Sequence, residues 1–289
     1  MTNELLIEMN ENFEKTAQML AASYGNDKKP YLQQCTKFPA REYRFKELVL
    51  LQELFFPNYF NCALGVHDIV ERLIQLYKII DTGCSAYTDR DNSIKASKRL
   101  IETLPEVRET LKLDIEAAFR GDPAAKDYTE IIRSYPGVKA IMIHRVAHII
   151  YSEGIPGYAR EMSENIHMLT GIDIHPGAKI GHYFFIDHGT GVVIGETCEI
   201  GKNVRLYQGV TLGVLHFQKG EGGVLKKGYK RHPTLGNNVI VGAGAKLLGP
   251  INIGDNVSIG ANSWIQEDVP SDTVVYITQH PTLEQRKKS

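Results

Sequence analysis

Three pairs of polar residues in the second half of the chain could support group transfer to a hydroxyl. They are Asp173 with His175, Asp187 with His188, and Arg231 with His232. A hydroxyl is a poor nucleophile until a base removes its proton, and histidine, with an ordinary pKa of about 6.5, suits that task. A carboxylate can orient the imidazole, an arginine can bind a substrate carboxylate, and aspartates can bind an ammonium group. Taken singly, Asp and His at loop corners are often only solvated turn residues, so the surrounding elements must bring the pairs together.

The segments that carry these pairs follow a period of six residues. Stepping by six meets an apolar residue each time in the series Ile174, Ile180, Ile186, Val192, Cys198, Val204 and Val210. A second series runs through Leu235, Val241, Leu247, Ile253, Ile259 and Ile265. A hexapeptide period is the sequence signature of a parallel β-helix, in which each hexad supplies a short strand and a tight corner. At about eighteen residues per coil, we expect a little over four stacked coils.

A segment rich in glycine and lysine, residues 214–234, separates the two series. A regular stack has no need of such an insertion, and long loops of this kind are commonly functional. Arg231 and His232 lie close to its end, which favours a site there. A surface loop without a function is the alternative interpretation.

The chain before this repeat is predicted to be helical. Apolar residues recur at three- and four-residue steps within residues 47–56, 69–80 and 137–154. Another helix is expected to start near Pro105 and to stop at Gly121, Asp122 and Pro123. The predicted fold class is therefore α+β: an all-α domain of roughly six to eight helices precedes a parallel β-helix. We expect the helical domain to span residues 1–168 and the β-helix domain, with its insertion and a short C-terminal tail, to span residues 169–289.

The composition is that of a globular protein close to neutrality. The formal net charge is −1 at pH 7, and 43% of the residues are hydrophobic. This balance argues against nucleic acid or an anionic membrane as a partner, and no apolar run approaches the ~20 residues of a spanning helix. The acidic N-terminal sequence lacks the features of a secretory signal, which favours a cytoplasmic location. Cysteines without C-x-x-C spacing favour reduced thiols: Cys35, Cys62, Cys84 and Cys198.

Several long motifs resemble those of the serine acetyltransferase family. The β part contributes DIHPGAKIGHYFFIDHGTGVVIGET, YQGVTLG, KRHPTLG and VGAGAKLLG, and the helical part contributes GDPAAKDY and YPGVKAIMIHRVAHIIY. The resemblance covers roughly residues 110–270. It implies a left-handed β-helix that transfers the acetyl group of acetyl-CoA to the hydroxyl of L-serine. The product would be O-acetyl-L-serine, in the first step of cysteine biosynthesis, and the attack would be direct, with no acetyl-enzyme.

The resemblance also implies roles for single residues on the serine side. His188, in IDHGTG, would be the general base, and Asp173, in DIHP, would be the carboxylate that orients it. Asp122 and Asp187 would bind the ammonium group of the substrate.

Other roles follow from the motifs further along the chain. Arg231 would bind the substrate carboxylate, His232 would lie beside the substrate, and Glu196 would orient His232. Acetyl-CoA would lie in the groove between neighbouring β-helices, and no metal is implied. Its pantetheine arm would pass the small residues Gly213, Ala243 and Ala261.

The family resemblance has consequences for partners. It implies a homo-oligomer, either a trimer or a dimer of trimers, with active sites in the grooves between subunits. L-Cysteine would be a feedback inhibitor that occupies the serine subsite. Many members bind O-acetylserine sulfhydrylase through a terminal isoleucine, whereas this chain ends in LEQRKKS, so we expect that complex to be weak or absent. The chain also departs from the family at Val214, where a second glycine is usual, and in its longer insertion, which leaves the CoA contacts there open.

Three other functions compete with this interpretation. A related acetyltransferase for a sugar or an antibiotic would have no need of an Asp and Arg set that suits a zwitterion. A non-catalytic scaffold would have no need of the complete His188, Asp173, Arg231 and His232 set. A γ-type carbonic anhydrase would hold zinc with three histidines, for which the candidates are His175, His182, His188, His216 and His232.

Overall fold

The computed structural model describes residues 13–23, 38, 42–61 and 64–278. The chain divides into two units, Met1–Phe38 and Pro39–Ser289. In the first unit, residues 13–23 form a helix with exposed side chains. Cys84 and Cys198 are free and buried. Cys35, Cys62 and the LEQRKKS tail lie outside the described residues, so the expectations for them stay predictions.

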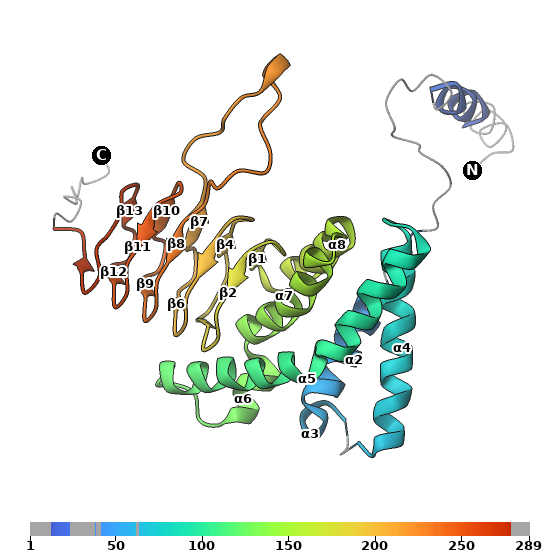
Figure 1. The fold of residues 1–289 in the computed structure, drawn as a ribbon, viewed down its shortest axis with the longest axis horizontal. Coiled ribbons are helices and arrows are strands. Elements are labelled where there is room, and N and C mark those ends of the chain that lie inside the picture. Colours follow the sequence, from blue (N-terminus) through green and yellow to red (C-terminus); the bar gives the residue numbers. More distant parts are fainter. Residues whose placement is uncertain (1–12, 24–37, 39–41, 62–63, 279–289) are drawn as a thin grey trace, which may run out of the picture. The chain divides into compact units, whose positions relative to one another are not determined.

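The second unit begins with helices, as predicted (Figure 1). They are α2 (Glu42–Phe55), α3 (Pro57–Phe60), α4 (Val66–Ser85), α5 (Arg90–Gly121), α6 (Tyr128–Ser134), α7 (Pro136–Ser152) and α8 (Pro156–Thr170). Helix α5 packs against α4 and α7, and α7 packs against α8. Helices α5 and α7 also contact strand β3 (Phe185–Ile186), and α8 contacts strand β1 (Asp173–Ile174), so the helices cover the first coil of the strand region.

The predicted helix start near Pro105 is wrong, because Pro105 lies inside α5. The helix starts instead at its N-cap Asp89, whose carboxylate accepts a hydrogen bond of 2.9 Å from the backbone N–H of Asn92. A proline inside a helix removes one backbone hydrogen bond and costs about 3 kcal/mol. Burial of apolar residues on one face, both before and after the proline, offsets that cost: Leu100, Leu104, Val107 and Leu111. The predicted stop at Gly121 is confirmed.

From Asp173 onward the chain forms short strands in three parallel sheets. The strands are β1 (Asp173–Ile174), β2 (Lys179–Ile180), β3 (Phe185–Ile186), β4 (Val193–Ile194), β5 (Glu199–Ile200), β6 (Arg205–Leu206), β7 (Thr211–Gly213), β8 (Thr234–Leu235), β9 (Ile240–Val241), β10 (Lys246–Leu248), β11 (Asn252–Ile253), β12 (Ser258–Ile259), β13 (Trp264–Ile265) and β14 (Val274–Val275). Sheet A has the order β1-β4-β7-β10-β13, sheet B has the order β11-β8-β5-β2, and sheet C has the order β14-β12-β9-β6-β3.

The chain visits sheets A, B and C in turn, so three successive strands make one coil. The hexad residues point into the coils, and most are fully buried, as Val192, Val210, Val241 and Leu247 illustrate at 0% exposure. This confirms the helical region followed by parallel strands, the arrangement of a hexapeptide β-helix. The left hand of the coil and the division into domains at residues 168 and 169 stay predictions.

Each coil turns at three corners, which we name by the sheets they connect. The B–C corners hold a ladder of amide side chains. Asn203 donates to Asn238 and Asn238 to Asn256, both at 2.9 Å, and Asn256 donates to Asp272 at 2.8 Å. All four residues have φ between 56° and 58°. Asn and Asp tolerate this left-handed conformation better than other non-glycine residues, so the ladder suits the corner.

We expect Asn238→Ala to destabilise the protein by about 1–2 kcal/mol, because alanine is strained at positive φ and the two amide hydrogen bonds are lost. Asn238→Gly also loses both bonds but keeps an unstrained backbone, so its loss should be smaller. The denaturation midpoints of the two variants would test this. A more stable alanine than glycine variant would contradict it.

The insertion leaves the coils at an A–B corner, between β7 and β8, and Figure 1 shows it extending beyond the stack. It contains the short helix η2 (Glu221–Gly223) and an antiparallel bridge between Lys219 and Leu225. None of the helices that the structure describes is long and apolar enough to span a membrane.

Candidate functional site

The first part of the site lies at the C–A corner that follows β3. His188 occupies this corner in the left-handed conformation, with φ 59°. Its side chain is 71% exposed, while that of the preceding Asp187 is 11% exposed. Nδ1 of His188 lies 3.8 Å from Oδ1 of Asp187. The corner therefore presents an accessible imidazole beside a shielded carboxylate.

Asp122 joins this corner from the end of α5. Its carboxylate accepts hydrogen bonds from the Tyr135 hydroxyl and, at 2.8 Å, from the backbone N–H of Ala124. These two donors hold the pKa of Asp122 below its ordinary value, with a smaller electrostatic contribution from nearby His188. The structure thus places Asp122 within electrostatic range of His188, next to which Asp187 lies, and the roles predicted for these residues stay predictions.

Asp173, predicted to orient His188, lies at the start of β1. Its Oδ1 atom accepts a hydrogen bond of 3.3 Å from Nη1 of Arg160, which belongs to α8. Within the described residues no hydrogen bond joins Asp173 to His188, so their pairing stays a prediction.

One group of side chains could hold a metal ion. Ligand atoms of Glu164, His167 and Asp173 lie within 4.8 Å of one another. Arg160 forms ion pairs with both carboxylates and so already supplies a positive charge there. Among the described residues, no other three donor side chains lie close enough together to bind a cation. The histidines proposed as zinc ligands, such as His188 and His232, do not belong to this group.

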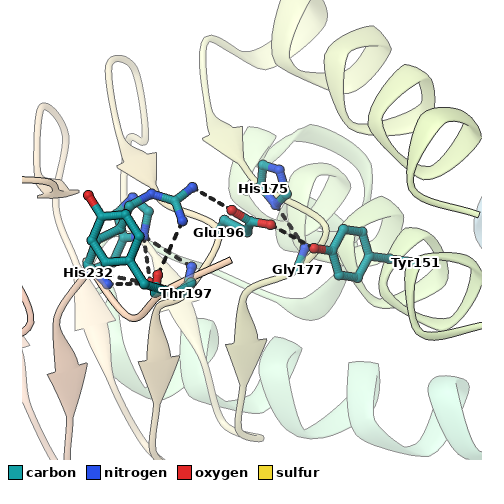
Figure 2. A network of polar contacts seen from close by, with 8 residues as sticks. Tyr151, His175, Gly177, Glu196, Thr197 and His232 are labelled. Atoms are coloured by element: carbon teal, nitrogen blue, oxygen red, sulfur yellow. Dashed lines mark hydrogen bonds and ion pairs between the residues drawn. The ribbon is translucent and has the colours of Figure 1, made fainter. Parts of the chain in front are cut away.

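The second part of the site lies at the A–B corners and is shown in Figure 2. Glu196, after β4, accepts hydrogen bonds from the guanidinium of Arg231 and, at 2.8 Å, from the hydroxyl of Tyr151 on α7. Burial alone raises the pKa of Glu196, but these two donors outweigh it and hold the pKa below its ordinary value. Glu196 therefore stays ionised and anchors Arg231.

His232 is held by Thr197, the residue after Glu196. Nδ1 of His232 lies 3.1 Å from the backbone nitrogen and 2.8 Å from Oγ1 of Thr197 (Figure 2). Burial and the neighbouring Arg231 guanidinium lower the pKa of His232 to about 4. The predicted contact between Glu196 and His232 is not among the hydrogen bonds of the described residues, because Glu196 is bonded to Arg231 and Tyr151 instead.

His175 lies at the same edge of the coils. Its Nδ1 atom accepts a hydrogen bond of 3.0 Å from Gly177, and its ring meets the ring of Tyr151 edge-on with centroids 5.7 Å apart. Burial lowers the pKa of His175. A cavity of about 300 Å³ adjoins this corner and is lined in part by Tyr151, Glu196 and Thr197.

Two members of this corner were not singled out from the sequence, namely Tyr151 and Thr197. The only sequence signal for them is that Tyr151 ends the motif YPGVKAIMIHRVAHIIY and that Thr197 ends IGET.

The small residues proposed for CoA lie at two different corners. Gly213 ends β7, at the A–B corner where the insertion begins. Ala243 follows β9 and Ala261 follows β12, so both lie at C–A corners. A Cβ at Gly213 would lie 3.0 Å from a methyl carbon of Thr211 and 3.1 Å from one of Leu248, which favours glycine there.

A family model and curated proteins match this chain. The model described as bacterial transferase hexapeptide (six repeats) matches residues 232–266. The serine acetyltransferase of Bacillus licheniformis is 48% identical over 179 residues, which cover 62% of this chain and 79% of that protein. The serine acetyltransferase (plasmid) of Synechococcus elongatus is 52% identical over 174 residues, covering 60% of this chain. The chain spans only 54% of that relative and 64% of a second one from the same organism.

Solved structures are similar over nearly the whole chain. Serine acetyltransferase isoform 3 from Entamoeba histolytica, in complex with cysteine, gives a TM-score of 0.79 at 45% identity and covers 94% of each chain. Serine acetyltransferase 1 from the same organism, in complex with L-cysteine, gives a TM-score of 0.78 at 44% identity. That match covers 93% of this chain and 100% of the other.

Proposed function

The chain belongs to the serine acetyltransferase family, and we propose that it transfers the acetyl group of acetyl-CoA to the hydroxyl of L-serine. The products are O-acetyl-L-serine and CoA. The observation that carries this proposal is the pair of complementary corners: an exposed histidine beside two carboxylates at one, and a partly buried arginine next to a buried histidine at the other. Together they match the ammonium, hydroxyl and carboxylate of an amino acid.

His188 acts as the general base in this mechanism. Its exposure at the tip of the corner supports access by the serine hydroxyl. The imidazole removes the hydroxyl proton while the oxygen attacks the thioester carbon. The tetrahedral intermediate then collapses, the carbon–sulfur bond breaks, and the CoA thiolate takes up the proton. Asp173 orients the imidazole once the substrate is bound.

The substrate ammonium group is bound by Asp122 and Asp187. Both carboxylates lie beside His188, and the lowered pKa of Asp122 supports its being ionised near neutral pH. The substrate carboxylate is bound by Arg231, whose guanidinium is held by Glu196 and can offer its remaining N–H groups.

The two corners lie on opposite sides of sheet A within one chain, which supports an assembly with shared sites. His188 lies between sheets C and A, whereas Arg231 lies between sheets A and B. We therefore assign His188 to one subunit and Arg231 to its neighbour in a homo-oligomer, either a trimer or a dimer of trimers. Sheet A joins both corners, and its outward residues Val193 and Trp264 are 36% and 64% exposed, which supports packing of a neighbour along this sheet.

The same assembly accommodates acetyl-CoA in the groove between neighbouring left-handed β-helices. Gly213 contributes from an A–B corner, and Ala243 and Ala261 contribute from C–A corners, so the groove again draws on two subunits. Small residues allow the pantetheine arm to approach the backbone closely.

L-Cysteine occupies the serine subsite as a feedback inhibitor. The related structures from Entamoeba histolytica are complexes with cysteine, which supports this assignment. Cysteine has the same ammonium and carboxylate groups as serine, so it uses the same aspartates and arginine. This places the reaction at the entry to cysteine biosynthesis.

Thiol release from acetyl-CoA tests the proposal, with L-serine, D-serine, threonine or a chloramphenicol-type alcohol as acceptor. We expect release to depend on L-serine and to be inhibited by L-cysteine in competition with serine. Turnover of another acceptor alone would reject the substrate but not the fold. If no acceptor is acetylated and the purified protein contains stoichiometric zinc, a γ-type carbonic anhydrase would be favoured instead.

A further inference from the structure

The hydroxyl of Thr197 organises the end of the insertion. Its Oγ1 atom accepts hydrogen bonds from the backbone N–H of Arg231 at 3.0 Å and from that of His232 at 3.1 Å. It also lies 2.8 Å from Nδ1 of His232. A hydroxyl has one donor and two acceptor positions, so its hydrogen must point toward Nδ1.

The backbone of Thr197 fixes the protonation of the same ring atom. Its N–H can only donate, and it donates to Nδ1 of His232 at 3.1 Å. An Nδ1 atom that accepts hydrogen bonds carries no proton, so a neutral His232 is the Nε2–H tautomer. No residue in the described part of the chain accepts a hydrogen bond from Nε2. The donor at Nε2 is therefore left for a ligand.

Gly195 makes room for this ring orientation. A Cβ atom at this position would lie 2.0 Å from Cδ2 and 2.1 Å from Nε2 of His232. Real Cβ atoms do not approach other atoms so closely, so any side chain here would displace the imidazole. Within the motif IGET, Gly195 thus leaves room for the imidazole of His232, Glu196 anchors Arg231, and Thr197 hydrogen-bonds to His232.

We propose that Thr197 is the positioning residue for His232 and fixes it as a neutral Nε2–H donor to the bound substrate. His232 is then a hydrogen-bond donor in the reaction, either to the substrate carboxylate or to the thioester oxygen, and is never the base. The assignment of a substrate contact rests on the proposed function, whereas the tautomer rests on the hydrogen bonds alone. The two histidines then have different roles: His188 is the general base, and His232 is a hydrogen-bond donor.

The tautomer is tested directly by ¹⁵N NMR of the full-length protein labelled at histidine, at pH 7. His232→Gln identifies the His232 signals. We expect the pattern of a neutral ring with Nδ1 unprotonated and Nε2 protonated. A protonated Nδ1, in either the other tautomer or the imidazolium, would overturn the proposal without any variant of Thr197.

The positioning role is tested by Thr197→Val, with Thr197→Ser as the matched control. Valine has a similar shape but no hydroxyl, so we expect kcat/KM for serine to fall roughly tenfold. The Nδ1 resonance of His232 should shift, because Nδ1 loses the hydrogen bond from Oγ1 and keeps only that from the backbone N–H. Serine keeps the hydroxyl and should restore both readouts. Unchanged kinetics and an unchanged Nδ1 resonance in a folded Thr197→Val protein would overturn the role.

The two levels of the proposal fail in distinguishable ways. Absence of serine-dependent thiol release from the unaltered protein would reject the proposed function, yet the ¹⁵N pattern would still decide the tautomer. Gly195→Ala offers an independent check, because it displaces His232 without removing any hydrogen-bonding group. We expect it to shift the His232 signals and lower kcat/KM, and unaltered signals would contradict the packing argument.

Discussion

Replacing His188 is expected to lower kcat/KM for serine acetylation by about 10²–10⁴-fold, the range contributed by a positioned general base. The variant of choice is His188→Asn, because His188 has φ 59° and asparagine tolerates this conformation better than alanine does. Its amide cannot take a proton near neutral pH. The side chain is largely exposed, so little stability should be lost and the kinetic effect should be separable from unfolding.

Steady-state thiol release, together with a melting curve for each protein, measures this effect. His182→Asn is a suitable control, since it removes another histidine of the first coil, at a B–C corner away from His188. We expect that control to keep nearly full activity. A His188→Asn protein that is folded and turns over serine at the normal rate would move the base to another residue.

The course of the backbone in the strand region could be predicted from the sequence because it depends on a local repeat. Each hexad must bury one apolar side chain, so the spacing of residues such as Val192 and Val241 predicts the coil directly. The helices were less accurately predicted at their ends. Pro105 is a usual start signal, but packing of Leu104 and Val107 carries α5 through it, and this tertiary effect has no local signature.

The site could be predicted in its residue types but not in its contacts. Glu196 and Tyr151 are 45 positions apart, and Thr197 and His232 are 35 apart, so their hydrogen bonds depend on how the coils stack and on where the insertion returns. The sequence therefore predicts a charged partner for His232, whereas in the structure its partner is the uncharged Thr197. The sequence also does not show that His188 and Arg231 lie at different corners of the coil.

That separation predicts complementation between two inactive proteins. Arg231→Ala is expected to lower kcat/KM by roughly a hundredfold, because a hydrogen-bonded charge pair with the substrate is lost. In a mixed oligomer, however, a site is complete wherever an Arg231→Ala subunit supplies His188 and its neighbour, a His188→Asn subunit, supplies Arg231. With equal amounts and random assembly, about one site in four is complete. Coexpression of the two variants should therefore recover roughly a quarter of the normal activity.

Differential tags allow the mixed oligomers to be purified and their thiol release compared with that of each variant alone. The control mixes His188→Asn with a His188→Asn, Arg231→Ala double variant, in which no complete site can form, so activity should stay at the level of the variants. Mixed oligomers of the two single variants that remain equally inactive would mean that both residues serve one site within a single chain. Because the two corners are separated by sheet A, such a result would also require Arg231 or His188 to move far from its described position. Random assembly predicts recovery of about a third in purified mixed trimers, each of which has one complete site in three, and of about a quarter in purified mixed dimers of trimers. Such recovery would instead tie the geometry of the coil to catalysis, since each chain would then supply the base of one site and the carboxylate-binding arginine of the next.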